Sequence, residues 1–161
     1  MSHAAEGSGT ATASTRYVFS TADTIRYRFP THTNLLIMDR AESATSEAFW
    51  VVLEPNEAPP LHVHPDAEQL FYVTEGAAVL RIGPDGSTVL DVRAGDLVRI
   101  PPGTYHSVKA AGNDRVVYLS FDCFIAGKPE TEPTWESHVR VLCAENNWSF
   151  EGVRWGQATA P

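Results

Sequence analysis

Two stretches of the chain carry residues that can bind a metal ion. The first, LHVHPDAEQLFYVTEG at residues 61–76, contains two histidines separated by one residue. If this stretch is a β-strand, His62 and His64 project from the same face, because alternate side chains of a strand point to opposite faces. Both imidazoles can then reach one ion. The simpler interpretation is two surface histidines in a loop after Pro59 and Pro60.

The second stretch, GDLVRIPPGTYHSV at residues 95–108, supplies a third histidine. Its pattern indicates a strand, a tight turn at 101–103 and a second strand that begins near His106. If the two stretches lie side by side, His106 reaches the ion held by the first two histidines. Three imidazoles and one oxygen ligand suit Zn²⁺, Fe²⁺, Mn²⁺, Ni²⁺ or Cu²⁺. The sequence therefore predicts one divalent transition metal per chain.

The elements that must position these residues are short strands. Runs rich in Val, Ile, Leu, Phe and Tyr begin at Tyr17 and are separated by Pro, Gly, Asp and Asn. This pattern is typical of an all-β sandwich or barrel, and nothing indicates the strand–helix alternation of a doubly wound fold. The turn sequences GPDGS at 83–87 and AGND at 111–114 each predict a hairpin between the runs that flank them.

The two metal-binding stretches resemble the paired motifs of the cupin superfamily. The second motif (Gly, five residues, Pro-x-Gly, two residues, His) is complete, and the first (His-x-His, Glu, Gly) is matched in part. The matching positions are His62, His64, Gly76, Gly95, Pro101, Gly103 and His106. The resemblance covers residues 47–123 and implies a double-stranded β-helix, or jelly-roll barrel, with a metal ion inside. It does not determine the reaction, because cupins include dioxygenases, isomerases, cyclases, lyases and ligand-binding proteins.

The resemblance leaves two candidates for the fourth metal ligand. Counting forward from the histidines gives Glu68, and counting back from the motif glycine gives Gln69. Strand alternation favours Gln69, because Phe71 and Val73 then share its inward face, although a β-bulge here would reverse the choice. A neutral Gln leaves the ion a stronger Lewis acid, whereas a Glu eases cycling between Fe²⁺ and Fe³⁺. If Gln69 is the ligand, Glu68 is the candidate general base.

Other polar residues have structural interpretations. We expect His32 to cap a turn, with a place at the pocket mouth as the alternative, and His138 to belong to the C-terminal segment. We expect Arg99 to lie at the surface or at a subunit contact, with binding of a substrate carboxylate as the alternative. The predicted barrel lining consists of Phe49, Val51, Phe71, Val73, Leu119 and Phe121.

Composition narrows the class of protein. The 161 residues suffice for one domain, and the net charge of −8 argues against nucleic acid and anionic membranes as partners. Cys123 and Cys143 form no CxxC pair, and no secretory or membrane-spanning segment is evident, so we expect a cytoplasmic protein. The cupin resemblance implies a homodimer.

We divide the chain into three parts by composition. Residues 1–15 are predicted to be a disordered tail, residues 16–125 the cupin barrel and residues 126–161 a C-terminal arm. The arm holds three of the four tryptophans, so we expect it to pack on the barrel or on a second subunit. Its segment 135–150 is predicted to be a short helix or strand, and residues 156–161 to fray.

These features predict a metal-dependent enzyme that acts on a small enolic, phenolic or hydroxyketone metabolite. A dioxygenase is the first hypothesis, and a non-redox isomerase, cyclase or lyase is the alternative. A cupin that binds a ligand without catalysis is the third. In each case the predicted metal ligands are His62, His64, Gln69 and His106, with Glu68 as the catalytic candidate.

Overall fold

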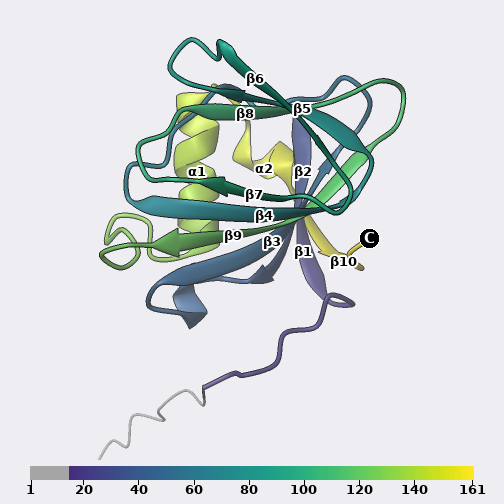
Figure 1. Cartoon of the computed structure of the whole chain (residues 1–161). Coiled ribbons are helices and arrows are strands. Elements are labelled where there is room, and N and C mark those ends of the chain that lie inside the picture. The colour runs from purple at the N-terminus through teal and green to yellow at the C-terminus, as the bar shows by residue number, and fades with distance from the viewer. Residues whose placement is uncertain (1–14) are drawn as a thin grey trace, which may run out of the picture.

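In the computed structural model, which describes residues 15–161, two antiparallel sheets face each other (Figure 1). The strands are β1 (Thr24–Phe29), β2 (His32–Met38), β3 (Ser46–Leu53), β4 (Ala67–Glu75), β5 (Ala77–Ile82), β6 (Thr88–Arg93), β7 (Leu97–Ile100), β8 (His106–Ala110), β9 (Val116–Phe124) and β10 (Arg154–Ala158). The larger sheet has the order β10-β1-β2-β3-β9-β4-β7, and the smaller has the order β6-β5-β8. Two antiparallel sheets closed on one core confirm the predicted all-β jelly-roll barrel. The predicted tail lies outside the described residues, apart from Thr15.

Alternation along the central strands sets the inner face of the larger sheet. In β4, the buried residues Ala67, Gln69, Phe71 and Val73 alternate with more exposed ones, as the sequence predicted. Phe49 and Val51 of β3 are buried as well. Side chains from this face and from β5 and β8 form the main core of the barrel.

Strand β9 departs from the predicted lining. Tyr118, Ser120 and Asp122 are its buried, inward residues, whereas Leu119 is half-buried and Phe121 is 38% exposed. The prediction that Leu119 and Phe121 line the barrel was therefore wrong. Large apolar residues occupy the outer face of this strand and polar ones the inner face.

One of the two predicted hairpins is present. The GPDGS turn joins β5 and β6, which pair from Ile82 opposite Thr88 onward. The AGND turn joins β8 to β9, but β8 pairs with β5 while β9 pairs with β3 and β4. The second hairpin prediction was therefore wrong, because the chain crosses between the sheets at this turn.

The C-terminal segment covers one side of the barrel with helix α1 (Trp135–Glu145), behind the sheets in Figure 1. Thr134 and Ser137 form a capping box at its start, and Asp39 Oδ1 accepts a hydrogen bond from the backbone N–H of Trp135 at 2.9 Å. The Trp135 ring packs on Phe49 with centroids 4.5 Å apart. Residues 135–145 are thus helical, and these contacts place the helix over the inner face of the larger sheet.

The last residues return to the larger sheet. After the short helix α2 (Phe150–Val153), β10 pairs antiparallel with β1, with Thr24 opposite Ala158. The expectation that residues 156–161 fray was wrong for this strand. Among residues 15–161, no helix is long and apolar enough to cross a membrane.

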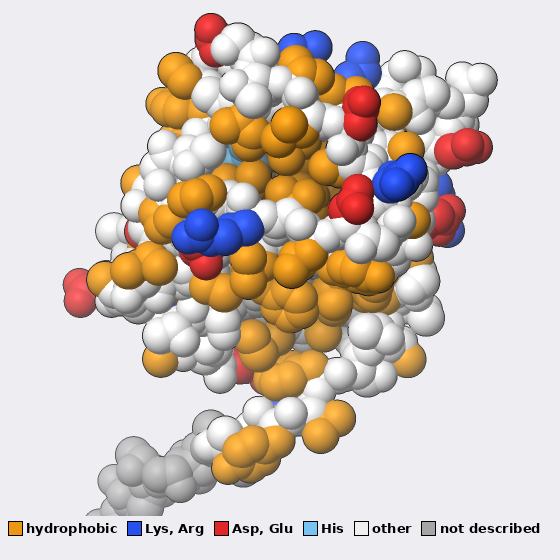
Figure 2. All heavy atoms as spheres, in the orientation of Figure 1, with side chains coloured by type: hydrophobic (Ala, Val, Ile, Leu, Met, Phe, Trp, Pro, Cys, Tyr) orange, Lys and Arg blue, Asp and Glu red, His pale blue; other side chains and the backbone are white. Residues whose placement is uncertain are grey.

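One face of the molecule carries many apolar side chains. Figure 2 shows a band of them over β4, β6 and β7. Exposed apolar residues of these strands include Tyr72, Val89, Leu90 and Leu97. A groove of about 510 Å³ lies between β6 and β7, and none of His62, His64 and His106 lines it. The histidine cluster therefore belongs to a different cavity.

Candidate metal centre

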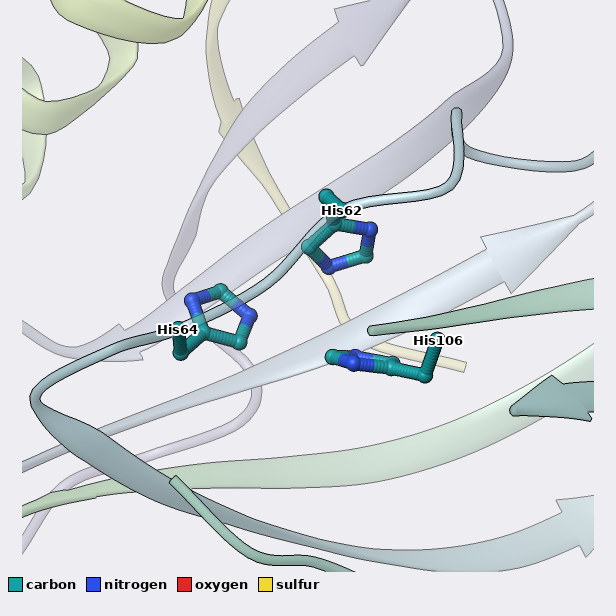
Figure 3. A group of neighbouring side chains, drawn as sticks. All are labelled: His62, His64 and His106. Carbon is teal, nitrogen blue, oxygen red and sulfur yellow. The ribbon is translucent and has the colours of Figure 1, made fainter. Parts of the chain in front are cut away.

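Backbone hydrogen bonds bring the two histidine-bearing stretches together. His62 and His64 lie in the extended segment before β4, and His106 is the first residue of β8. The backbone N–H of His62 donates to His106 O at 3.1 Å, and that of His106 donates to His62 O at 2.8 Å. Gly103 N–H also donates to His64 O at 2.8 Å, which ties the tight turn to the same segment. One ring nitrogen of each histidine lies within 4.8 Å of the others (Figure 3).

All three imidazoles are held in the neutral form, which is the form that binds a metal ion. Burial, together with the nearby His64, lowers the pKa of His62 to about 4. Burial also lowers the pKa of His64 to about 3 and that of His106 to about 4. The cluster therefore carries no charge of its own at neutral pH.

Gln69 and Glu68 point in opposite directions from β4. The side chain of Gln69 lines the cavity, and its Oε1 lies 3.1 Å from His106 Nε2. Glu68 lies on the other face, where its Oε2 accepts a hydrogen bond from Arg99 Nε at 2.7 Å. The structure therefore places Gln69, but not Glu68, beside the three histidines. A general-base role for Glu68 does not fit this position, because strand alternation turns its carboxylate away from the cavity.

Both ring nitrogens of His106 face acceptor oxygens, so the neutral ring can donate its hydrogen to only one of them. His106 Nδ1 lies 3.1 Å from Thr104 O, which accepts the ring hydrogen in the tautomer that can bind a metal ion through Nε2. Its Nε2 then presents a lone pair to Oε1 of Gln69, whose own amide nitrogen donates to Asp122 Oδ1 at 2.8 Å. A cation between Nε2 and Oε1 satisfies both atoms in that tautomer, whereas without a cation the neutral ring can carry its hydrogen on Nε2 and donate it to Gln69.

The other two histidines point to the same conclusion. His62 Nδ1 lies 2.8 Å from Pro60 O, so its hydrogen faces that carbonyl and its Nε2 is left as a lone pair. His64 Nε2 is buried and has no hydrogen-bond partner among the described residues. The three imidazoles and the Gln69 oxygen are thus a neutral donor set that fits a divalent transition metal.

A cavity of about 260 Å³ opens beside the three histidines. Its walls are largely apolar and aromatic, and they include Phe49, Val51, Val108, Tyr118, Trp135 and Trp148. His32 is also in the wall, stacked on Phe29 with centroids 4.5 Å apart, rather than only capping a turn as expected. Arg99 lies at the surface, where its side chain is 64% exposed.

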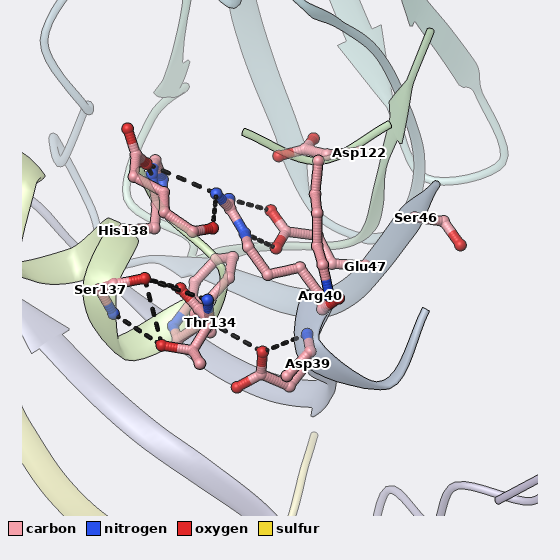
Figure 4. A network of polar contacts seen from close by, with 12 residues as sticks. Asp39, Arg40, Ser46, Glu47, Asp122, Thr134, Ser137 and His138 are labelled. Carbon is pink, nitrogen blue, oxygen red and sulfur yellow. Dashed lines mark hydrogen bonds and ion pairs between the residues drawn. The ribbon is translucent and has the colours of Figure 1, made fainter. Parts of the chain in front are cut away.

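A buried polar network that the sequence did not reveal continues from the cavity toward α1 (Figure 4). Asp122 lies beside Glu47, and both oxygens of Glu47 accept hydrogen bonds from Arg40, at 2.6 and 2.7 Å. Arg40 also lies 3.4 Å from Glu132, which bonds His138 Nδ1 at 2.6 Å. Alternation in β3 was the available signal for Glu47, because it places Glu47 on the same face as Phe49 and Val51.

Comparison with known proteins identifies the class. Residues 49–122 match the family model described as Cupin domain. With the paired sheets and the histidine cluster, this match shows that the chain belongs to the cupin superfamily. A comparison with curated proteins finds no match.

Solved structures with this fold come from several bacteria. A predicted oxalate decarboxylase from Thermotoga maritima is 16% identical, with a TM-score of 0.60, and the match covers 68% of this chain and 100% of that one. The polyketide cyclase RemF from Streptomyces resistomycificus is 23% identical, with a TM-score of 0.57 and coverage of 71% and 82%. A Bacillus halodurans protein is 24% identical, with a TM-score of 0.49 and coverage of 50% and 64%. At these identities the likeness to the decarboxylase and the cyclase shows the fold.

Proposed function

We propose that the protein is a metal-dependent enzyme that performs a non-redox reaction, an isomerisation, cyclisation or elimination, on a small enolisable metabolite. The observation that carries the proposal is the neutral donor set, with Gln69 rather than Glu68 facing the histidines. When bound, a divalent ion would supply Lewis acidity to a substrate oxygen that gains negative charge. Because no ligand neutralises the ion, this geometry favours Lewis-acid chemistry over the dioxygenase ranked first from the sequence.

The cavity favours a small substrate with an apolar body. Its volume of about 260 Å³ lies just below the range of about 300–1,000 Å³ common for small-molecule sites. The aromatic walls pack against a flat ring or an unsaturated chain, and they exclude water from the reacting oxygens. A hydroxyketone, enol or phenol with neighbouring oxygens matches both the walls and the metal-binding groups.

We propose His138 as the side chain that moves the proton. It lines the cavity, and its Nδ1 is bound to Glu132 Oε2 at 2.6 Å. A carboxylate that holds one ring nitrogen orients the imidazole and leaves the other nitrogen to accept a proton. This assignment replaces Glu68, which lies outside the cavity. A homodimer and a cytoplasmic location stay predictions.

Metal content and oxygen dependence test the proposal. Protein purified without chelator or metal-affinity resin is analysed by elemental mass spectrometry, with His106→Ala as the variant and His32→Ala as the matched control. His32 is a buried cavity histidine outside the cluster. We expect near-stoichiometric metal in the wild type and the control, and little in His106→Ala.

Activity is then followed with a panel of enolic and hydroxyketone compounds in D₂O under nitrogen and under air. Metal-dependent deuterium incorporation or conversion under nitrogen supports the proposal. Conversion only with oxygen uptake supports the dioxygenase. A wild-type protein without metal, even after reconstitution, overturns both.

A further inference from the structure

A row of three buried polar side chains crosses three neighbouring strands below the histidines. Gln69 of β4 pairs across the sheet with Asp122 of β9, and Asp122 pairs with Glu47 of β3. These residues are 8%, 3% and 0% exposed, respectively. Side chains directly opposite each other in antiparallel strands lie close enough to interact. The row therefore joins the candidate metal centre to the carboxyl groups behind it.

The Gln69 amide has two possible orientations, and its neighbours distinguish them. On one side lies His106 Nε2, at 3.1 Å from Oε1, and on the other lies Asp122 Oδ1, at 2.8 Å from the amide nitrogen. The opposite orientation would place the amide oxygen against the Asp122 oxygen, and two acceptors repel. It would also aim the N–H₂ group at His106, which blocks that nitrogen and removes the oxygen ligand.

Asp122 is well suited to hold one orientation. Burial raises the pKa of its carboxyl group, while the hydrogen bond from Gln69 and the positive charges nearby lower it. A carboxyl group keeps an acceptor oxygen in both protonation states. Glu47, on its other side, is already bound by two nitrogens of Arg40, which fixes the row in place.

We propose that Asp122 is a positioning residue that holds the Gln69 amide with its nitrogen toward β9 and its oxygen toward His62, His64 and His106. The inference rests on the proposed function, because it concerns the fourth ligand of that metal centre. Residues that orient metal ligands typically affect metal affinity about 10–100-fold when they are replaced. Asp122 acts through Gln69 and does not itself touch the ion.

The test is a Co²⁺ titration followed by the visible absorption of the bound ion. Asp122→Leu keeps the branched shape of the side chain but has no acceptor, so we expect Gln69 to turn its N–H₂ group to His106 and Co²⁺ affinity to fall about 10–100-fold. We also expect a changed Co²⁺ spectrum, because an oxygen ligand is lost. Asp122→Asn keeps an acceptor oxygen at the same place, and we expect it to retain wild-type affinity within about threefold.

A double-mutant cycle separates positioning from a structural role. In a Gln69→Met background no amide is left to orient, so adding Asp122→Leu should change Co²⁺ affinity by less than about threefold. An equal loss in both backgrounds would show that Asp122 only supports the fold. Glu47→Gln is the matched control. It alters the same buried row without touching Gln69 and should leave the Co²⁺ spectrum unchanged.

A measurement on the wild-type protein covers the case in which Asp122→Leu does not fold. The NMR resonances of the Gln69 side chain are assigned by their disappearance in Gln69→Met. The hydrogens of its N–H₂ group should exchange slowly with solvent, with and without Zn²⁺. The Gln69 13Cδ resonance should shift when Zn²⁺ is added. Fast exchange, or an unmoved 13Cδ resonance in the metal-loaded protein, overturns the inference but leaves the proposed function standing. Failure of the wild type to bind Co²⁺ or Zn²⁺ overturns both.

Discussion

Glu68 and Arg99 form an ion pair on the outer face of β4 and β7, with 2.6 Å between Oε2 and Nη2. Leu70, two residues further along β4, is the cross-strand neighbour of Arg99. The pair keeps the carboxylate next to Gln69 away from the cavity, on the solvent side of the sheet. The side chain of β4 that faces the histidines is therefore the neutral amide of Gln69.

Replacement of Glu68 should leave the metal centre intact. In Glu68→Gln we expect Co²⁺ affinity and the Co²⁺ spectrum to stay at wild-type values, and stability to change by less than about 1 kcal/mol, because exposed ion pairs contribute little. Urea unfolding and Co²⁺ titration measure the two quantities, with Gln69→Met as the comparison that should lose affinity. If Glu68→Gln loses as much Co²⁺ affinity as Gln69→Met, Glu68 contributes to metal binding and this prediction is wrong.

The sequence predicted β4 well because one face of this strand is apolar. Phe71 and Val73 indicate which face of the strand points inward, and Gln69 lies on the same face by alternation. Strand β9 has large apolar residues on its outer face, so hydrophobicity alone put Phe121 inside and missed Asp122. The carboxylate of Asp122 is satisfied by Gln69, a residue far away in the chain, and local patterns carry no such information.

The sequence also did not reveal which strands pair with each other. A turn such as AGND reverses the chain, but it does not determine which strand pairs with the next one. Here β8 stays with β5, and this crossing is what brings His106 beside His62. The three clustered histidines could be found from motif spacing, whereas the residues that surround them required the tertiary structure.

The stability of the metal-free protein should fall as the solution becomes acidic. His106 has a pKa of about 4 when folded, against about 6.5 when unfolded. Between these values the unfolded chain binds more protons, so His106 lowers the free energy of unfolding by about 1.4 kcal/mol for each pH unit of acidification. His32, His62 and His64 act in the same direction.

Glu47 acts in the opposite direction over part of this range. Burial raises its pKa to about 7, so the folded protein holds a proton that the unfolded chain releases between about pH 4.5 and 7. Comparison of the wild type with His106→Gln isolates the histidine, because Glu47 is present in both. Urea unfolding in EDTA between pH 7.5 and 4.5 should give a smaller pH dependence for His106→Gln. Equal slopes would contradict the low pKa of His106.

The buried ion pair of Arg40 and Glu47 should be costly to break. Their side chains are 3% and 0% exposed, so above pH 7, where Glu47 is ionised, Arg40→Met leaves its carboxylate without a partner in the protein interior. We expect a loss of about 3–5 kcal/mol of stability, measured by urea unfolding. The double variant Arg40→Met/Glu47→Met removes both charges and should lose less than the single one. A double variant that is less stable than Arg40→Met would show that the pair does not act through charge.

Gly76 and Gly95 provide a matched test of the turns that frame the barrel. Both have positive φ, of 80° and 98°, so alanine at either position costs about 1–2 kcal/mol of backbone strain. A Cβ atom at Gly76 would also lie 2.2 Å from Arg115 O, whereas a Cβ at Gly95 meets nothing within 4 Å. Gly76→Ala should therefore lose about 1–3 kcal/mol more stability than Gly95→Ala in urea unfolding.

Metal binding should not depend on this turn. Gly76 lies seven residues along the chain from Gln69, about 23 Å in an extended strand, so folded Gly76→Ala should still bind one Co²⁺ per chain. Equal losses in the two variants would mean that Arg115 moves aside, and lost Co²⁺ binding in folded Gly76→Ala would mean that this turn controls the distant centre.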